Sequence, residues 1–310
     1  MSWKPSASIE TLQQRAKLNA YIREFFIQRD VLEVETPQLS KAAVDDANLQ
    51  PIQANACDSP VYLHTSPEYP MKRLLAAGSG DIYQICKTFR DGEMGKRHNP
   101  EFTMLEYYRL RFDLKSLMDE VAQLIGDYLH IQRRVELSYA QAFNQFAGID
   151  VFTIDDGELR ERVSEFVGAE LSLSRDECLD IIMSHVVEPQ FPKHALVFIF
   201  NYPASQAALA NTFVDQNDNE LAKRFELYVN GLELANGYHE LTDVQEQQAR
   251  FNRQAGKMEH SRPMDQYFLQ ALEHGLPDCS GVAIGLDRVL MLKQKVESIA
   301  QVVSFEFGRA

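Results

Sequence analysis

The chain has 310 residues, of which 45% are hydrophobic and 25% charged, values that are typical of a globular enzyme with one large domain. Its 45 acidic and 31 basic residues give a formal net charge of −14, which argues against a broad nucleic-acid-binding surface because such binding depends on phosphate neutralisation. No stretch approaches the roughly 18 apolar residues of a membrane span, and the start of the chain lacks a signal peptide's apolar core, so we expect a cytoplasmic protein without a membrane partner.

Periodicity and capping residues predict helices and strands through the first half of the chain. Ser8 suits the N-cap of a first helix, and the following VLEVETP reads as a strand whose proline ends it or places it at a sheet edge. Residues 61–90 predict a short strand, a helix closed by Gly78 and a second strand. Residues 113–132 have the apolar spacing of another helix.

The second half of the chain predicts an insertion followed by more strands. Residues 155–187 are acidic and helical, with a capping box from Ser174 to Glu177, and we interpret residues 155–190 as a helical insertion between sheet strands. Two strands, a helix and a strand-to-helix step follow, at 196–202, 223–236, 241–258 and in SGVAIGLDRVLML. The four cysteines are far apart, and we expect free thiols at Cys57, Cys86, Cys178 and Cys279.

The segment RFELYVNGLELANG predicts a tight hairpin with two carboxylates on one face. Asn230-Gly231 lies between two alternating runs and favours a two-residue type I′ turn. In the resulting register Tyr228 pairs with Glu233, and Glu226 pairs with Ala235. Glu226 and Glu233 then become diagonal neighbours, close enough to reach one bound cation, although a solvated outer face explains them equally well.

A second strand carries an unusual row of side chains. Counting by two through FRDGEMGKRHNPEFTMLEYYR places Phe102, Met104, Glu106 and Tyr108 on one face. A carboxylate and a phenol beside an aromatic ring indicate a face that meets a ligand.

A nucleotide would need a cradle other than the common phosphate loops, because no Walker A sequence and no strand-linked G-x-G-x-x-G is present. Arg90 and Arg288 can direct guanidinium groups at phosphates, and the acidic hairpin can hold Mg²⁺. Phe102 offers a flat apolar face to a purine. Each of these side chains taken alone also suits a structural role, so it is their combination that favours a ligand site.

These segments resemble the signature motifs of class II lysyl-tRNA synthetases over essentially the whole chain. HNPEFTMLEYY with the preceding Phe89-Arg90 resembles motif 2, GLDR resembles motif 3, and VETP resembles the motif 1 strand. TSPE and GLELANGYHELTD resemble sequences typical of the lysine enzymes. The resemblance implies an α+β fold, the class II aminoacyl-tRNA synthetase catalytic fold with an antiparallel β-sheet flanked by helices. It also implies ATP and Mg²⁺ as cofactors and a homodimer.

Within this family, the chain is most similar to stand-alone paralogues that attach (R)-β-lysine to a lysine of elongation factor P. Only one predicted helix precedes the motif 1 strand, so we expect residues 1–310 to form one catalytic domain without an anticodon-binding domain. PASQAALA and PDCSGVAIG also fit these paralogues. The resemblance implies an AMP-forming ligase that acts on lysine or β-lysine and on elongation factor P, with no tRNA as acceptor.

The resemblance assigns the amino-acid site to several motif residues. Glu106, Tyr108 and Glu240 would hold the side-chain ammonium of the substrate. Ala283 stands where lysyl-tRNA synthetases carry glycine, and its methyl group would disfavour the α-amino acid by about 1–3 kcal/mol. The remaining substrate-binding assignments are Ser66, Pro67, Glu68 and Asn236.

The nucleotide and metal assignments follow from the same motifs. Arg90 would address the carboxylate and the α-phosphate, and Phe102 and Arg288 would lie on opposite faces of adenine, with the γ-phosphate as an alternative partner of Arg288. Glu226 and Glu233 would hold Mg²⁺, and we assign the catalytic roles to Arg90, Glu233 and Arg288. The other nucleotide-binding assignments are Asp91, Gly92, His98, Asn99, Leu234 and Gly285.

One departure from the family's pattern leaves alternatives open. Motif 2 of the family runs Arg-x-Glu, whereas this chain has Gly92 at the glutamate position and a glutamate, Glu93, only one residue later. Either Glu93 or Asp91 substitutes, or ATP binding is weakened. The alternatives are an inactive synthetase-like module that binds an amino acid for regulation, a truncated lysyl-tRNA synthetase, and an ammonia-using amide synthetase on the same fold.

Overall fold

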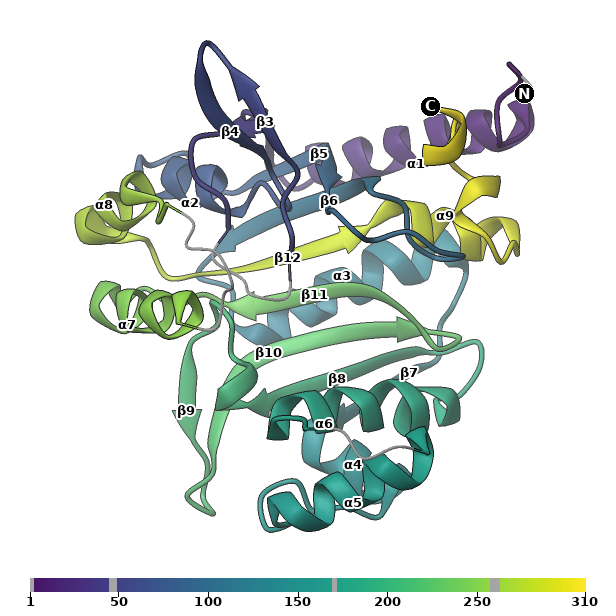
Figure 1. The fold of residues 1–310 in the computed structure, drawn as a ribbon. Coiled ribbons are helices and arrows are strands. Elements are labelled where there is room, and N and C mark those ends of the chain that lie inside the picture. The colour runs from purple at the N-terminus through teal and green to yellow at the C-terminus, as the bar shows by residue number, and fades with distance from the viewer. Residues whose placement is uncertain (1–2, 45–48, 169–171, 257–262) are drawn as a thin grey trace.

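The computed structural model describes residues 3–44, 49–168, 172–256 and 263–310, and within these ranges a nine-stranded sheet forms the centre of the molecule (Figure 1). Its inner strands are all antiparallel, and parallel pairs occur only at the two ends, between β1 and β5 and between β7 and β8. In spatial order the strands are β1 (Leu32–Glu33), β5 (Ile82–Phe89), β6 (Glu101–Leu110), β12 (Cys279–Gly285), β11 (Leu232–His239), β10 (Glu220–Val229), β8 (Leu196–Pro203) and β7 (Arg134–Ser138), with β9 (Thr212–Val214) beside β10.

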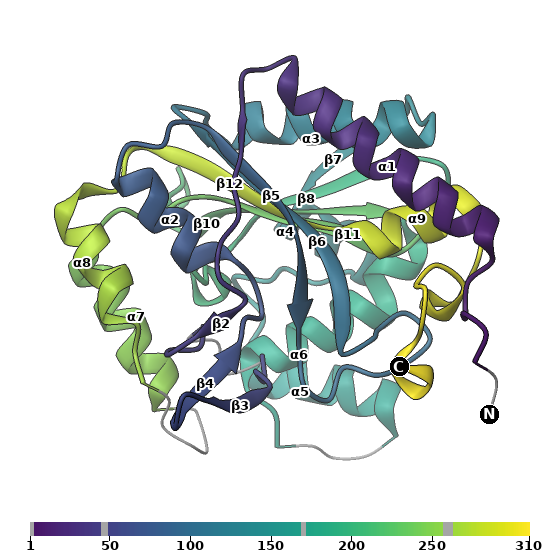
Figure 2. The same cartoon turned by 90° about the horizontal axis from the view of Figure 1, so that it is seen from above.

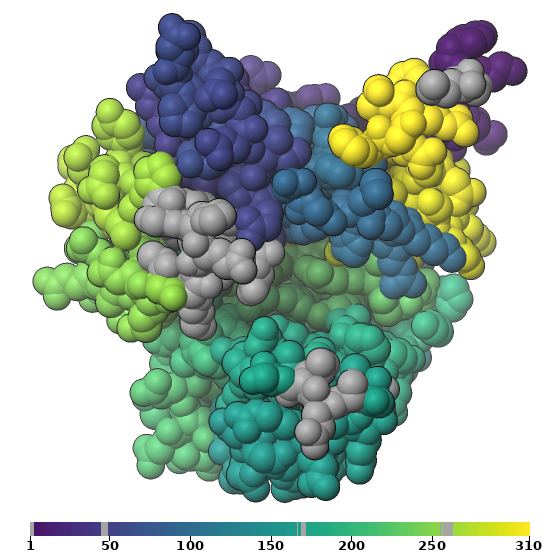
Figure 3. All heavy atoms as spheres, in the orientation of Figure 1, coloured from purple at the N-terminus to yellow at the C-terminus, as the bar shows by residue number. Residues whose placement is uncertain are grey.

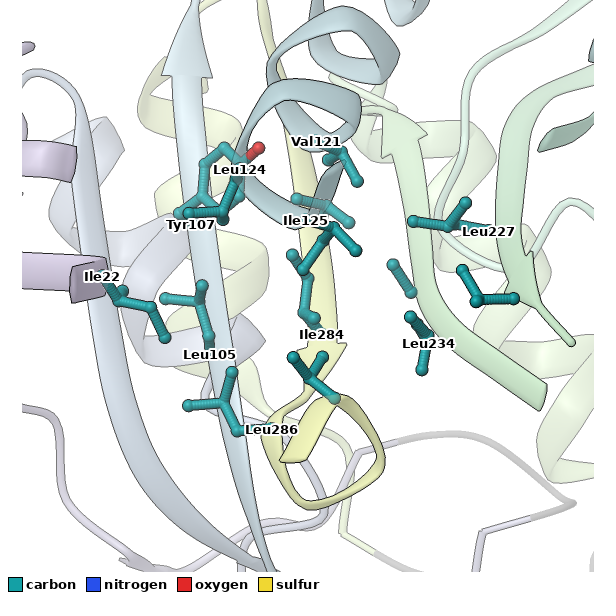
Figure 4. Packing of buried hydrophobic residues seen from close by; sticks show 14 of the residues in the cluster. Ile22, Leu105, Tyr107, Val121, Leu124, Ile125, Leu227, Leu234, Ile284 and Leu286 are labelled. Carbon is teal, nitrogen blue, oxygen red and sulfur yellow. The ribbon is translucent and has the colours of Figure 1, made fainter. Parts of the chain in front are cut away.

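Helices α1 (Ile9–Ile27), α3 (Leu114–Leu129) and α9 (Leu286–Gln294) cover one face of this sheet (Figure 2). Alternation along β6 directs Leu105 and Tyr107 into that core, where Val121 and Ile125 of α3 meet Ile284 of β12 (Figure 4). The other face of β6 is therefore left for the row that begins at Phe102. Three core clusters of this kind hold the described residues together.

Two further groups of elements border the opposite face. Helices α2 (Glu68–Ala76), α7 (Val244–Ala255) and α8 (Gln266–Gly275) pack together at one end, and the small sheet of β2 (Leu39–Ser40), β4 (Ser59–Leu63) and β3 (Gln53–Ala56) projects beside them (Figure 1). Helices α4 (Tyr139–Ala147), α5 (Asp156–Val167) and α6 (Arg175–Ile182) lie in the chain between β7 and β8. They are followed by a π-helical turn, Met183–Val187, and short 3-10 turns occur at Glu188–Gln190, Ala204–Gln206, Ile299–Gln301 and Phe307–Arg309.

The capping predictions are confirmed, and the predicted first strand is too long. The Ser8 hydroxyl accepts the N–H of Thr11 at 3.1 Å, and the capping box from Ser174 to Glu177 is present. Of the strand predicted in VLEVETP, only Leu32 and Glu33 form a strand, β1, at the edge of the sheet. The sequence prediction missed the strands β2, β3, β7 and β9 and the helices α4 and α8. All four cysteines are free, and no helix in the described parts of the chain is long and apolar enough to cross a membrane.

The predicted hairpin turn is confirmed, but the predicted pairing of Glu226 is wrong. Asn230 and Gly231 have φ angles of 55° and 73°, as a type I′ turn requires, and Tyr228 pairs with Glu233. Glu226 does not pair with Ala235, however, because a β-bulge shifts the register and Glu226 opposes Asn236. The bulge lets two consecutive residues of β11, Leu234 and Ala235, both enter the core.

The bulge also changes which side chains of β11 lie on the same face of the sheet. Strict alternation would place Glu233 and Asn236 on opposite faces, since three positions separate them. One extra residue reverses the alternation, so that Asn236 and the residues two and four positions beyond it, Tyr238 and Glu240, join Glu233 on the same side.

Candidate active site

A cavity of about 1010 Å³ lies on the sheet face that α1, α3 and α9 leave uncovered. In Figure 3 the surface is hollowed at its centre, where green residues lie recessed between blue and teal segments. The cavity brings together most of the predicted site: Ser66, Glu68, Arg90, His98, Asn99, Phe102, Glu106, Tyr108, Glu233, Leu234, Asn236, Glu240, Ala283, Gly285 and Arg288. Four predicted residues do not line it, namely Pro67, Asp91, Gly92 and Glu226.

Strand register explains how residues far apart in sequence become neighbours here. Directly opposed positions place Gln84, Glu106, Ala283, Asn236 and Glu226 in one row across five adjacent strands. Ala283 therefore lies between the carboxylate of β6 and the amide of β11. A methyl group at this point of the row occupies the middle of the cavity wall.

Glu106 is a buried carboxylate at one end of the cavity, with 3% of its surface exposed. Its Oε1 accepts a hydrogen bond from the Tyr108 hydroxyl at 2.7 Å, and its Oε2 accepts one from the Ser66 hydroxyl at 2.8 Å. Burial and the nearby Glu68 carboxylate raise the pKa of Glu106 to about 8. Both direct donors are neutral hydroxyl groups, so this carboxylate is prepared for a cationic ligand.

Two further carboxylates at this end share a lysine that the sequence analysis did not identify. The ammonium Nζ of Lys72 lies 2.6 Å from Glu68 Oε1 and 2.5 Å from Glu240 Oε2. Burial, opposed by Lys72, raises the pKa of Glu240 to about 7, and although burial alone disfavours a charged lysine, the two carboxylates hold the pKa of Lys72 above its ordinary value. A lysine four residues after a site glutamate on a predicted helix was the available signal.

Gly281 is a second functional residue that was missed. A Cβ at this position would lie 2.3 Å from Cε1 of Tyr108 and 2.7 Å from Oε1 of Glu240. Only glycine lets both side chains cross β12 at this point. A glycine inside a predicted strand is the signal for such a close approach.

Cationic side chains gather at the other end of the cavity. Nη1 of Arg288 donates to the backbone oxygen of Glu233 at 2.9 Å and to its carboxylate at 3.3 Å, and Nη2 lies 2.8 Å from Nε2 of His98. The guanidinium of Arg90 lies over the ring of Phe102, 5.0 Å from its centroid. Two guanidinium groups and an aromatic ring are the chemistry expected around a nucleotide's phosphates and base.

At the motif 2 position where the family has a glutamate, the turn at Gly92 determines which neighbouring acidic residue faces the cavity. Gly92 has a φ of 77°, and this turn directs Glu93 toward the cavity, where Nη1 of Arg90 lies 3.4 Å from Glu93 Oε1. Asp91 is exposed and accepts the N–H of Gly92 at 2.9 Å. Of the two candidates for the missing glutamate, Glu93 is the one that lies at the cavity wall.

The two hairpin glutamates differ in how free their oxygens are. Oε1 of Glu226 accepts from Arg224 at 2.5 Å, and Oε2 accepts from the Tyr228 hydroxyl. Glu233 keeps 40% of its side chain exposed, and partial burial together with the neighbouring Glu226 raises its pKa. Across the described ranges, no three His, Cys, Asp or Glu side chains form a group that could hold a metal ion. This donor set fits Mg²⁺ held by one or two carboxylates together with phosphate oxygens, and it does not form a metal centre by itself.

Two amide side chains at the cavity differ in the same way. Both polar atoms of the Asn99 side chain have a partner, since its Nδ2 donates to the backbone oxygen of Glu101 at 2.7 Å and its Oδ1 accepts the N–H of Phe307 at 3.0 Å. Asn236 has a buried Oδ1 for which the described part of the chain supplies no hydrogen-bond partner. A buried acceptor without a partner is costly, so Asn236 is the amide that is available to a ligand.

Comparison with known proteins agrees with this architecture. The family described as tRNA synthetases class II (D, K and N) matches residues 1–307, and the chain belongs to this family. Among curated relatives, the elongation factor P--(R)-beta-lysine ligase of Salmonella gallinarum (strain 287/91 / NCTC 13346) is 47% identical over 322 residues, which cover 100% of this chain and 98% of the relative. The protein of the same name from Salmonella paratyphi B (strain ATCC BAA-1250 / SPB7) is 46% identical over 327 residues, with the same coverage. The expected fold class is thereby confirmed.

Proposed function

We propose that the protein is an ATP-dependent, AMP-forming ligase that activates (R)-β-lysine and transfers it to a lysine of elongation factor P. The observation that carries the proposal is the polarity of one cavity, with buried carboxylates at one end and the guanidinium groups of Arg90 and Arg288 at the other. Such a cavity is complementary to an amino acid with two ammonium groups whose carboxylate faces ATP. The names of the relatives support the same substrate and acceptor.

In the proposed complex the side-chain ammonium of the substrate binds Glu106 and Tyr108, and Arg90 orients the substrate carboxylate. One carboxylate oxygen attacks the α-phosphorus of ATP, the bond to pyrophosphate breaks, and a mixed anhydride with AMP forms. The amine of the acceptor lysine then attacks the carbonyl carbon, loses a proton, and displaces AMP. No side-chain nucleophile is needed, since catalysis rests on positioning and on neutralising charge.

Mg²⁺ is part of this proposal as a partner of the triphosphate. Glu233 would hold it from the cavity wall, and Glu226 would contribute once one of its oxygens exchanges Arg224 or Tyr228 for the metal. The ion would neutralise phosphate charge while Arg288 lies beside it. Phe102 would stack on adenine once the guanidinium of Arg90 moves from the ring to a phosphate.

The remaining proposals concern the isomer and the assembly. Ala283 supports a preference for the β isomer, because its methyl group lies in the wall between Glu106 and Asn236. Residues 1–310 would form one catalytic domain with an insertion between β7 and β8, a homodimer would cover exposed apolar side chains such as Ile27 and Leu32, and a translation factor as acceptor implies a cytoplasmic location.

The test is ATP–pyrophosphate exchange with (R)-β-lysine, (S)-β-lysine and (S)-α-lysine, followed by transfer of labelled amino acid to purified elongation factor P or to bulk tRNA. We expect exchange with (R)-β-lysine, label in the protein and none in tRNA, as the net charge of −14 also suggests. Label in tRNA alone would overturn the proposed acceptor. Binding of lysine isomers without any exchange would favour a regulatory module.

A further inference from the structure

Lys72 lies behind the carboxylate end of the cavity and is not among the residues that line it. Helix α2 carries it one turn after Glu68, and its side chain is 1% exposed. Its ammonium contacts Glu68 and Glu240, and the ring of Phe268 lies on another side, 5.9 Å from Nζ to the ring centroid. The ammonium therefore contacts two carboxylates that a ligand reaches, without contacting the ligand.

The charges at this end of the cavity do not cancel. Glu68, Glu106 and Glu240 all line the cavity, and the Glu68 carboxylate raises the pKa of both Glu106 and Glu240. With all three carboxyl groups ionised, one ammonium leaves two uncompensated negative charges; in the unliganded pocket Glu106, whose pKa is about 8, holds a proton instead. Buried charges without partners are costly, and two ammonium groups on a ligand would balance them.

Lys72 also decides which carboxylate is left for the ligand. Both cation contacts of Lys72 go to Glu68 and Glu240, whereas Glu106 receives only the hydroxyl groups of Ser66 and Tyr108. Without the lysine, Glu68 and Glu240 would repel each other across the space that Nζ occupies, and each would compete for a ligand's ammonium group.

We propose that Lys72 is a positioning residue that sets the net charge of the pocket and thereby selects an amino acid with two ammonium groups. The inference rests on the proposed function and extends it, because it makes the number of charges on the substrate a consequence of one buried side chain. Lys72 acts through Glu68 and Glu240, and Glu106 remains the carboxylate that binds the second ammonium group.

The test compares pockets of different charge. Lys72→Met leaves three negative charges, Glu240→Gln leaves one, and the double variant Lys72→Met/Glu240→Gln restores the two of the wild type. Each protein is assayed by pyrophosphate exchange with (R)-β-lysine, the lysine isomer of the proposed function, and with 3-aminohexanoic acid, which has the same chain length and only one ammonium group. Lys87→Met, an exposed lysine on β5 paired with Glu101, is the matched control.

We expect Lys72→Met to raise KM for (R)-β-lysine by about tenfold or more with little change in KM for ATP, because Glu68 and Glu240, once they lose their shared cation, compete with Glu106 for the ammonium groups of the substrate. Glu240→Gln should move the ratio of kcat/KM toward 3-aminohexanoic acid, and the double variant should recover most of the preference for (R)-β-lysine. Lys87→Met should match the wild type.

A loss of activity in Lys72→Met has to be distinguished from a loss of folding. Removal of one partner from a buried ion pair strongly destabilises a protein, so the folding of Lys72→Met has to be checked by circular dichroism. If it does not fold, the charge-balanced double variant remains, and a double variant that folds but has lost its preference for (R)-β-lysine overturns the inference. A wild-type KM for (R)-β-lysine in folded Lys72→Met overturns it as well. If the wild type itself exchanges with no diamino acid, it is the proposed function that fails.

Discussion

The carboxyl group of Glu106 should make the unliganded protein less stable as the pH rises. Glu106 is 3% exposed, and burial with the nearby Glu68 raises its pKa from the ordinary value of 4.5 to about 8. Between these two values the native protein holds a proton that the unfolded chain releases. The free energy of unfolding therefore falls by about 1.4 kcal/mol per pH unit in this window, through this group alone.

Glu106→Gln removes the titration and keeps an oxygen that accepts from the Tyr108 hydroxyl. The variant should gain on the wild type with each pH unit, and the difference in unfolding free energy should approach about 4 kcal/mol near pH 8. Urea unfolding in unit steps from about pH 5 to about pH 8 measures this difference. Glu101→Gln, an exposed site on the same strand, should show no such trend.

Ligand binding provides a second readout of the same group. A diamino acid should stabilise the wild type at high pH, where Glu106 is ionised, and should fail to stabilise Glu106→Gln. A difference between Glu106→Gln and the wild type that stays constant across the pH range would refute the assigned ionisation. A variant that still binds the diamino acid tightly would refute the role of Glu106 as the ammonium ligand.

Three further predictions concern the cavity wall. Gly281→Ala should raise KM for the amino acid and lower Tm, because the added methyl group meets the Tyr108 ring at 2.3 Å, whereas Gly285→Ala, whose Cβ meets Cδ of Arg288 at 3.7 Å, should keep the wild-type Tm. Equal Tm values for the two variants would contradict the packing argument. Ala283→Gly should raise kcat/KM for (S)-α-lysine relative to (R)-β-lysine by about tenfold, and an unmoved ratio would leave Ala283 with a packing role only. Glu233→Gln should lower pyrophosphate exchange by at least about 100-fold with an unchanged circular dichroism spectrum; exchange at the wild-type rate would remove the metal assignment.

Local features of this chain are readable from its sequence because they depend on neighbours a few positions away. The alternation that directs Glu106 and Tyr108 to one face, the Ser8 cap and the Asn230-Gly231 turn are all of this kind. The motif resemblance extends over the whole chain, and most of the residues that it selected line the cavity. A motif gives no information about side-chain contacts, so Glu226 was assigned to Mg²⁺ although its two oxygens accept hydrogen bonds from Arg224 and Tyr228.

Only the tertiary structure decided how these pieces meet. The bulge in β11 follows from burying Leu234 and Ala235 together, and it alone brings Asn236 to the face that carries Glu233. The ion pair between Lys72 and Glu240 joins α2 to the end of β11, two segments that are adjacent only once the sheet has formed. Strand register and buried charge pairing depend on contacts between distant residues, and for that reason no local pattern of the sequence specifies them.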